Sequence, residues 1–166
     1  MRNWNGWTAG VVAASLIAVS PAAAQSVKLT GIGGQTATVA ATDLAAMPRV
    51  AVTLQLEGGR SEACEGVALT DLLQKVGAPQ GKALRGPEMA DVVEIAAADG
   101  YHVALALAET DALMTAKKIV LADRCNGGPM AAPEGPFRLV VEGDLRPARS
   151  ARQVTSISVL RLPAAP

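Results

Sequence analysis

The side chains most suited to acid–base chemistry are neighbours: the only tyrosine, Tyr101, and the only histidine, His102, directly follow Asp99-Gly100. An imidazole beside a phenol is a plausible general acid–base pair. Residues 92–107, however, are rich in Val, Ile, Leu and Ala and are interrupted by Asp-Gly, which predicts a β-hairpin with a two-residue turn. Adjacent strand residues point to opposite faces, so we do not expect these two side chains to act together. A serine-type triad is not supported either, since no Gly-x-Ser-x-Gly segment is present, and no catalytic residue is assigned.

The two cysteines, Cys64 and Cys125, are the remaining candidates for redox or metal chemistry. An even number of cysteines in an exported chain favours a disulfide. The alternative is a thiolate metal ligand or a redox pair, but the C-x-x-C spacing is absent. A zinc site built from Cys64, Cys125 and His102 would have three ligands, yet their spacing matches no known zinc finger. We therefore predict a structural Cys64–Cys125 disulfide.

Residues 1–24 have the pattern of a secretory signal peptide. An early positive charge, Arg2, precedes an apolar run from Ala9 to Val19, and small residues end at Ala24. That run is shorter than the roughly 20 residues that a membrane-spanning helix needs. We expect cleavage near Ala24, a periplasmic or secreted location without stable membrane insertion, and one domain over 25–166.

Composition excludes some classes of partner. Basic and acidic residues number 15 each, so the bulk charge does not attract nucleic acid or an anionic membrane. Both tryptophans lie in the signal segment, which leaves Tyr101 and Phe137 as the aromatic residues of the domain. Base-stacking surfaces need several rings, so we expect no nucleic-acid partner.

The periodicity of apolar residues predicts many short strands and a few short helices. No repeat or linker interrupts them, which indicates a single β-rich α+β domain. The expected strands lie within 26–41, 49–59, 92–107, 116–123, 137–144 and 152–162, and the expected helices within 42–48, 65–81 and 108–115.

The order of these segments resembles the oxidoreductase molybdopterin-binding domain family, which has the fold of the sulfite oxidase catalytic core. The resemblance covers about residues 50–159 and rests on four motifs in order. They are Gly66-Val67-x-Leu69, Asp99-Gly100-Tyr101, Leu121-Ala122 with Asn126-Gly127, and Gly135-Pro136-x-Arg138-Leu139-Val140. The resemblance implies that fold, and it implies molybdopterin as a cofactor.

The chain departs from the family where the metal is bound. In the family, a cysteine thiolate at the end of the strand before the Gly-Val-x-Leu helix holds the molybdenum. Here that strand end is Leu54-Gln55-Leu56-Glu57, and neither leucine nor glutamine replaces a thiolate. Cys64 lies too close to Gly66 to match the usual ligand, so we assign no metal ligand and keep Cys64 only as an alternative.

Three arginines are candidate cofactor contacts by this resemblance: Arg138, Arg149 and Arg152. The guanidinium group offers several donors to a phosphate. The alternative interpretation is a solvated basic loop for Arg149 and Arg152, and a strand residue with its stem along apolar neighbours for Arg138.

Two functions remain open. The first is an accessory or ligand-binding module on this fold, with no cofactor expected, that binds a small molecule or a periplasmic partner protein. The alternative is a periplasmic molybdopterin-dependent oxidoreductase, supported by the resemblance in fold.

Overall fold

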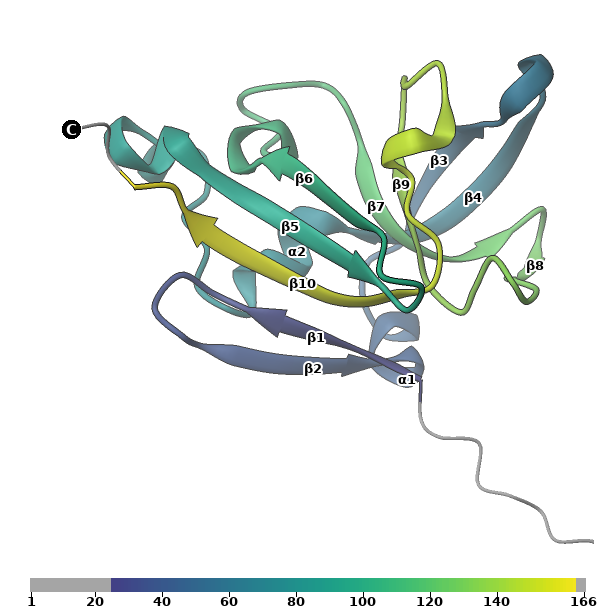
Figure 1. Cartoon of the computed structure of the whole chain (residues 1–166), viewed down its shortest axis with the longest axis horizontal. Helices are drawn as coiled ribbons and strands as arrows, with labels where there is room; N and C mark the ends of the chain where they lie inside the picture. The colour runs from purple at the N-terminus through teal and green to yellow at the C-terminus, as the bar shows by residue number, and fades with distance from the viewer. Residues whose placement is uncertain (1–24, 164–166) are drawn as a thin grey trace, which may run out of the picture.

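The computed structural model describes residues 25–163, so the predicted signal peptide at 1–24 lies outside the described residues. The described residues form two β-sheets, two short α-helices and several short 3-10 turns. Figure 1 shows the sheets side by side, with the hairpin of β3 (Val50–Gln55) and β4 (Ser61–Ala68) and the C-terminal end of β10 (Val154–Arg161) at opposite ends of the molecule. Within 25–163, no helix is long and apolar enough to cross a membrane.

The first sheet has the strand order β2-β1-β10-β5-β6. Its strands are β1 (Ser26–Thr30), β2 (Thr36–Ala40), β5 (Asp91–Ala97), β6 (His102–Ala106) and β10 (Val154–Arg161). β1 and β10 pair in parallel, and the other neighbours are antiparallel. Buried residues alternate with more exposed ones along β5, so one face of the sheet covers the core.

The second sheet is centred on β7. It consists of β3 (Val50–Gln55), β4 (Ser61–Ala68), β7 (Ile119–Cys125), β8 (Gly128–Pro129) and β9 (Arg138–Val141). β4 pairs with one edge of β7, while β8 and β9 pair with the other. Where β4 crosses β7, a Cβ atom on Gly66 would lie 2.0 Å from the carbonyl oxygen of Leu121, so this position requires glycine.

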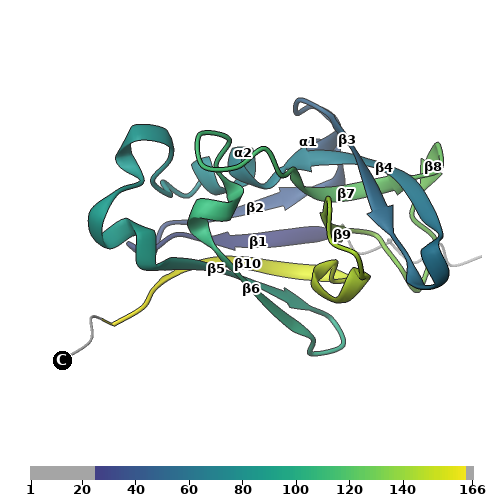
Figure 2. The ribbon, with the colours of Figure 1, turned by 90° about the horizontal axis from the view of Figure 1, so that it is seen from above.

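Helices α1 (Ala41–Ala45) and α2 (Leu69–Gln74) are both short. In α2, Leu69, Leu72 and Leu73 are buried and belong to the main core, which lies between the two sheets. Figure 2 shows α2 on the same side of the first sheet as β4 and β7. A smaller core covers the other face of the second sheet, so the first four residues of β7 and all of β9 are buried on both faces. Its members are Val52, Leu54, Cys64, Val120, Ala122 and Val140.

The architecture confirms the predicted β-rich α+β fold, with three local differences. The helix expected within 108–115 is a short 3-10 turn at Leu107–Thr110. Strand β4 was not predicted, because its sequence SEACEGVA carries two glutamates and a glycine among few large apolar residues. The turn between β5 and β6 spans three residues, 98–100, rather than two: the amide of Ala97 donates to the carbonyl of Tyr101. Gly100 takes the positive φ of 84° that such a turn requires.

Candidate functional site

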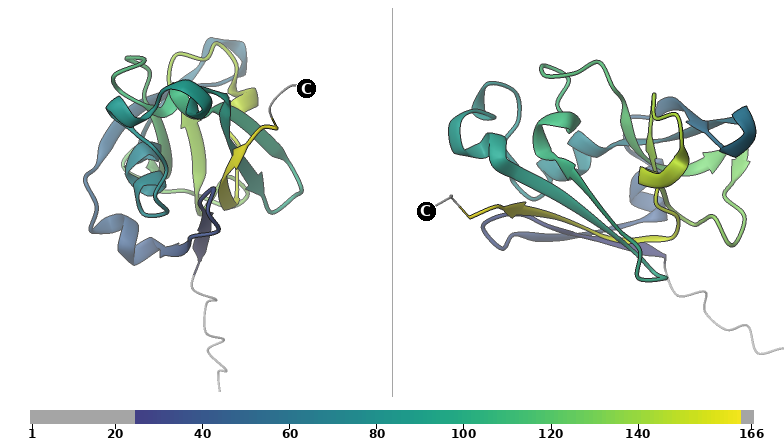
Figure 3. Two further views of the ribbon diagram at one scale, coloured as in Figure 1. Left: turned by 90° about the vertical axis from the view of Figure 1, so that its left-hand side faces the viewer. Right: turned by 45° about the horizontal axis from the view of Figure 1, so that its top comes forward.

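The largest cleft, of about 600 Å³, lies where three loops meet at one end of the sheets. The loops are the β3–β4 turn, the β5–β6 turn and the connection from β9 to β10, which lies between the two turns in the right-hand view of Figure 3. Glu134, in the β8–β9 connection, completes the lining. The lining residues include four arginines and three acidic residues: Arg60, Arg138, Arg146 and Arg152, with Glu57, Asp99 and Glu134. The cleft is therefore strongly polar, with a formal excess of one positive charge.

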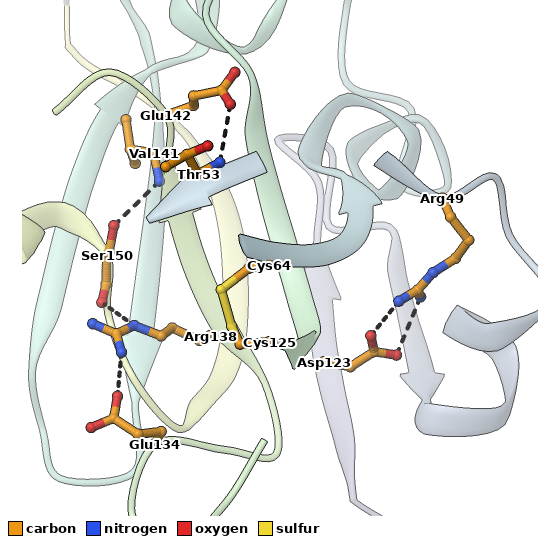
Figure 4. The surroundings of a disulfide bond; sticks show 10 residues. All are labelled: Arg49, Thr53, Cys64, Asp123, Cys125, Glu134, Arg138, Val141, Glu142 and Ser150. Carbon is orange, nitrogen blue, oxygen red and sulfur yellow. Dashed lines mark hydrogen bonds and ion pairs between the residues drawn. A yellow bond between two sulfur atoms is a disulfide. The ribbon is translucent and has the colours of Figure 1, made fainter. Parts of the chain in front are cut away.

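Arg138 is the buried charge of this cleft. It is the first residue of β9 and is only 6% exposed. Its Nε donates to the carbonyl oxygen of Ser150 at 3.3 Å, and its Nη1 forms an ion pair with Glu134 (Figure 4). Burial lowers the pKa of Arg138, and the nearby carboxylate of Glu134 opposes that shift. Arg138 is the one charged residue of β9, whose other residues are Leu139, Val140 and Val141, and its side chain lines the cleft.

Arg152 also lines the cleft, and its Nη1 donates to the second oxygen of Glu134 at 3.1 Å. Glu134 is thus held between two guanidinium groups, Arg138 and Arg152. Two of the three arginines predicted from the sequence therefore meet at one carboxylate.

Arg149, the third predicted arginine, lies outside the cleft. Its Nε and Nη2 donate to the two oxygens of Asp144 at 2.8 and 2.7 Å, and its Nη1 donates to Glu109 at 3.0 Å. These hydrogen bonds from Arg149 lower the pKa of Asp144 below its usual value. The contacts fix the β9–β10 connection, on which the cleft residues Arg146 and Ala148 stand.

Tyr101 and His102 make separate contacts, as the strand geometry predicted. The hydroxyl group of Tyr101 donates to the carbonyl oxygen of Ala148 at 2.7 Å, and Tyr101 lines the cleft. His102 is exposed and its Nδ1 lies 3.2 Å from a carboxylate oxygen of Glu94. Tyr101 therefore ties two of the cleft loops together, while His102 does not line the cleft.

Sequence reasoning missed two cleft arginines, Arg60 and Arg146, and the carboxylate Glu134. Arg60 directly follows the turn residues Gly58-Gly59. A charged residue beside a turn is only a weak indication of a binding site, although binding residues often lie on loops. Arg146 lies in the β9–β10 connection, and no motif in the sequence marked it as a site residue. The same connection is held in place by the contacts of Arg149 with Asp144 and Glu109.

The predicted disulfide is confirmed. Cys64 on β4 lies directly opposite Cys125 on β7, and their sulfur atoms are bonded. A second cavity, of about 200 Å³, reaches Cys125 and is also lined by Glu62, Glu134 and Arg138. The disulfide cavity and the cleft therefore share a wall, formed by Glu134 and Arg138 (Figure 4).

The cleft residues do not fit a molybdenum centre held by a protein thiolate. Leu56, which follows β3, lines the cleft at the strand end where the resembling family has its cysteine. Among the described residues that line the cleft, none is a cysteine or a histidine. The sulfur atoms of both cysteines are engaged in the disulfide, so neither is a thiolate ligand.

Comparisons with known proteins support the fold. The sulfane dehydrogenase SoxCD from Paracoccus pantotrophus has a similar solved structure, with a TM-score of 0.59 and 19% sequence identity. The similarity covers 81% of this chain and 38% of that one, so the chain spans well under half of the length of this neighbour. The sequence matches no family model, and no curated protein matches it. The likeness shows a related fold.

Proposed function

We propose that this chain is a ligand-binding module that takes a small oxyanion in the arginine-lined cleft and does not hold molybdenum through a protein thiolate. The observation that carries the proposal is the nearly buried guanidinium of Arg138 in the wall of a cleft of about 600 Å³. The leader pattern at 1–24 and the disulfide support an exported location for this function.

The charge arrangement favours an anionic ligand. Glu134 is already shared by Arg138 and Arg152. Within residues 25–163, Arg60 and Arg146 have neither an ion pair nor a side-chain hydrogen bond, although both line the cleft. Two guanidinium groups thus remain available for a ligand, beside a buried third one. Planar guanidinium groups bind carboxylate, sulfate and phosphate oxygens through paired hydrogen bonds.

The same residues favour binding over covalent catalysis. The described lining contains neither a thiol nor an imidazole, and two of its other candidate groups already have partners. Glu134 is paired with Arg138 and Arg152, and the hydroxyl oxygen of Ser150 accepts a hydrogen bond from the amide of Val141. Tyr101 uses its hydroxyl group to hold Ala148. An accessory module of this kind presents its ligand to a periplasmic partner protein. The alternative, a molybdopterin-dependent oxidoreductase, draws its support from the fold alone.

Isothermal titration calorimetry with inorganic sulfate and with inorganic phosphate tests the proposal. We expect saturable binding to the wild type that weakens with added salt. The double variant Arg60→Gln/Arg146→Gln should bind at least about tenfold more weakly, because each lost charge-assisted hydrogen bond contributes roughly 1.5–3 kcal/mol.

Arg85→Gln is the matched control, because Arg85 is exposed and does not line the cleft. It should bind both anions as the wild type does. Equal affinity of the double variant and the wild type, or no binding of either anion by the wild type, would refute the proposed site.

A further inference from the structure

The Cys64–Cys125 disulfide lies beside the carboxylate of Glu62. A carboxylate oxygen of Glu62 and the sulfur atoms of Cys64 and Cys125 all lie within 4.8 Å of one another. Among the described residues, none forms an ion pair or a hydrogen bond with the Glu62 side chain. Two sulfurs and one oxygen are therefore gathered at one point, and the oxygen has no other partner.

We propose that reduction of the Cys64–Cys125 disulfide creates a binding site for a thiophilic divalent cation of the Zn²⁺ class, with the two thiolates and Glu62 as ligands. The disulfide and the bound metal are mutually exclusive states of the same three side chains. The site lies in the cavity next to the anion cleft and shares Arg138 and Glu134 with the wall of the cleft, but metal binding by these three ligands does not require anion binding.

The geometry suits tetrahedral coordination. Ligand atoms at about 2.0–2.3 Å from a zinc ion lie roughly 3.3–3.8 Å apart. The Glu62 oxygen lies within 4.8 Å of both sulfurs, so a side-chain shift on the order of 1 Å brings it to that separation. Cys64 and Cys125 face each other in register across β4 and β7, so the paired backbones hold the two thiolates together after the bond between them breaks. Three protein ligands leave the fourth position for water.

The surroundings provide access and charge balance. Cys64 is buried, whereas Cys125 is half-buried and lines a cavity of about 200 Å³. A metal ion reaches the sulfurs through this cavity. Two thiolates and a carboxylate carry three negative charges, of which a divalent cation offsets two. The guanidinium group of Arg138 lines the same cavity and stabilises the remaining charge.

A two-electron reduction opens the Cys64–Cys125 disulfide. A dithiol or phosphine reductant delivers two electrons to the disulfide, and each sulfur takes up a proton. A dithiol becomes a cyclic disulfide, whereas a phosphine takes its oxygen from a water molecule, which also supplies the two protons, and becomes a phosphine oxide. Metal binding then releases the two thiol protons, so binding tightens as the pH rises toward the thiol pKa.

Titration of the phosphine-reduced protein with Co²⁺ under anaerobic conditions tests the proposal, followed by displacement with Zn²⁺. The reduced wild type should bind one Co²⁺ per chain, with thiolate-to-cobalt charge-transfer absorption and the visible bands of a tetrahedral site. The oxidised wild type and Cys125→Ser should lack the charge-transfer band of a two-thiolate site.

Glu62→Gln isolates the oxygen ligand, because it leaves both thiols in place. It should weaken Co²⁺ binding by at least about tenfold. Glu94→Gln, a carboxylate change on the other sheet, is the control and should bind as the wild type does. A thiol assay and the circular dichroism spectrum check that each reduced variant carries two thiols and remains folded.

Three results would overturn the proposal. The first is a folded, reduced wild type without charge-transfer absorption. The second is wild-type affinity in Glu62→Gln. The third is a reduced chain that loses its β-sheet spectrum and does not regain it with Co²⁺.

Discussion

Breaking the Cys64–Cys125 bond should lower the melting temperature by an amount that the loop length sets. The bond closes a loop with a sequence separation of 61 residues. In the chain-entropy model, a loop of that length restricts the unfolded chain enough to stabilise the fold by about 4 kcal/mol, as an upper value. A domain of roughly 140 residues has an unfolding entropy near 0.3 kcal/mol per kelvin, so the expected fall is about 14 °C.

Thermal unfolding followed by circular dichroism, with and without a phosphine reductant, measures this fall. The buffer should contain a chelator, so that metal binding by the free thiols does not restore stability. The double variant Cys64→Ala/Cys125→Ala is the control: it should melt below the oxidised wild type and show no further change with reductant. A fall of less than about 3 °C in the wild type would refute the loop-entropy reasoning.

Three further outcomes are expected. N-terminal sequencing of the exported protein should begin at Gln25, and a retained Met1 would contradict the predicted leader. Asp144→Asn should lower the free energy of unfolding at neutral pH. The pKa of Asp144 is depressed in the fold, so its contribution is present above the unfolded pKa and is lost as the pH falls through the folded one. The urea unfolding curve of Asp144→Asn should therefore approach that of the wild type below about pH 4. A difference in unfolding free energy that stays constant down to pH 2 would count against the Arg149 contact. Gly66→Ala should cost about 3 kcal/mol in urea unfolding, because its Cβ would meet the Leu121 carbonyl, and an unchanged midpoint would contradict that packing.

The fold was largely predictable because its strongest signals are local. Asp99-Gly100 between two apolar runs specified the β5–β6 hairpin, and the leucines at 69, 72 and 73 specified the buried face of α2. Strand β4 was not predicted because two of its inward-facing positions do not hold large apolar residues. One is the disulfide cysteine Cys64, and the other is Gly66, where the backbone of β7 leaves no room for a side chain. Strand β4 pairs with β3, which directly precedes it, and with β7, which is distant in sequence, and its own residues show little apolar periodicity.

The candidate site was predictable only in part. Arg138 and Arg152 were identified through the resemblance, and the structure brings both to Glu134. Arg149 belongs to the same basic segment, but its guanidinium group turns to Asp144, which a sequence cannot reveal because the choice depends on how the loop folds. Arg60 lines the cleft only because loops that are far apart in the sequence lie together in the fold, and such long-range contacts cannot be inferred from local sequence patterns.

Molybdenum analysis of the protein, purified after export from a host that makes the molybdopterin cofactor, tests the central claim most directly. Leu56 stands in the cleft where the resembling family has its thiolate, and Cys64 is bonded to Cys125. The account predicts molybdenum well below one atom per chain in the wild type, and no change in Cys64→Ser. A stoichiometric molybdenum content in the wild type that is lost in Cys64→Ser would contradict it and make Cys64 the metal ligand of an enzyme.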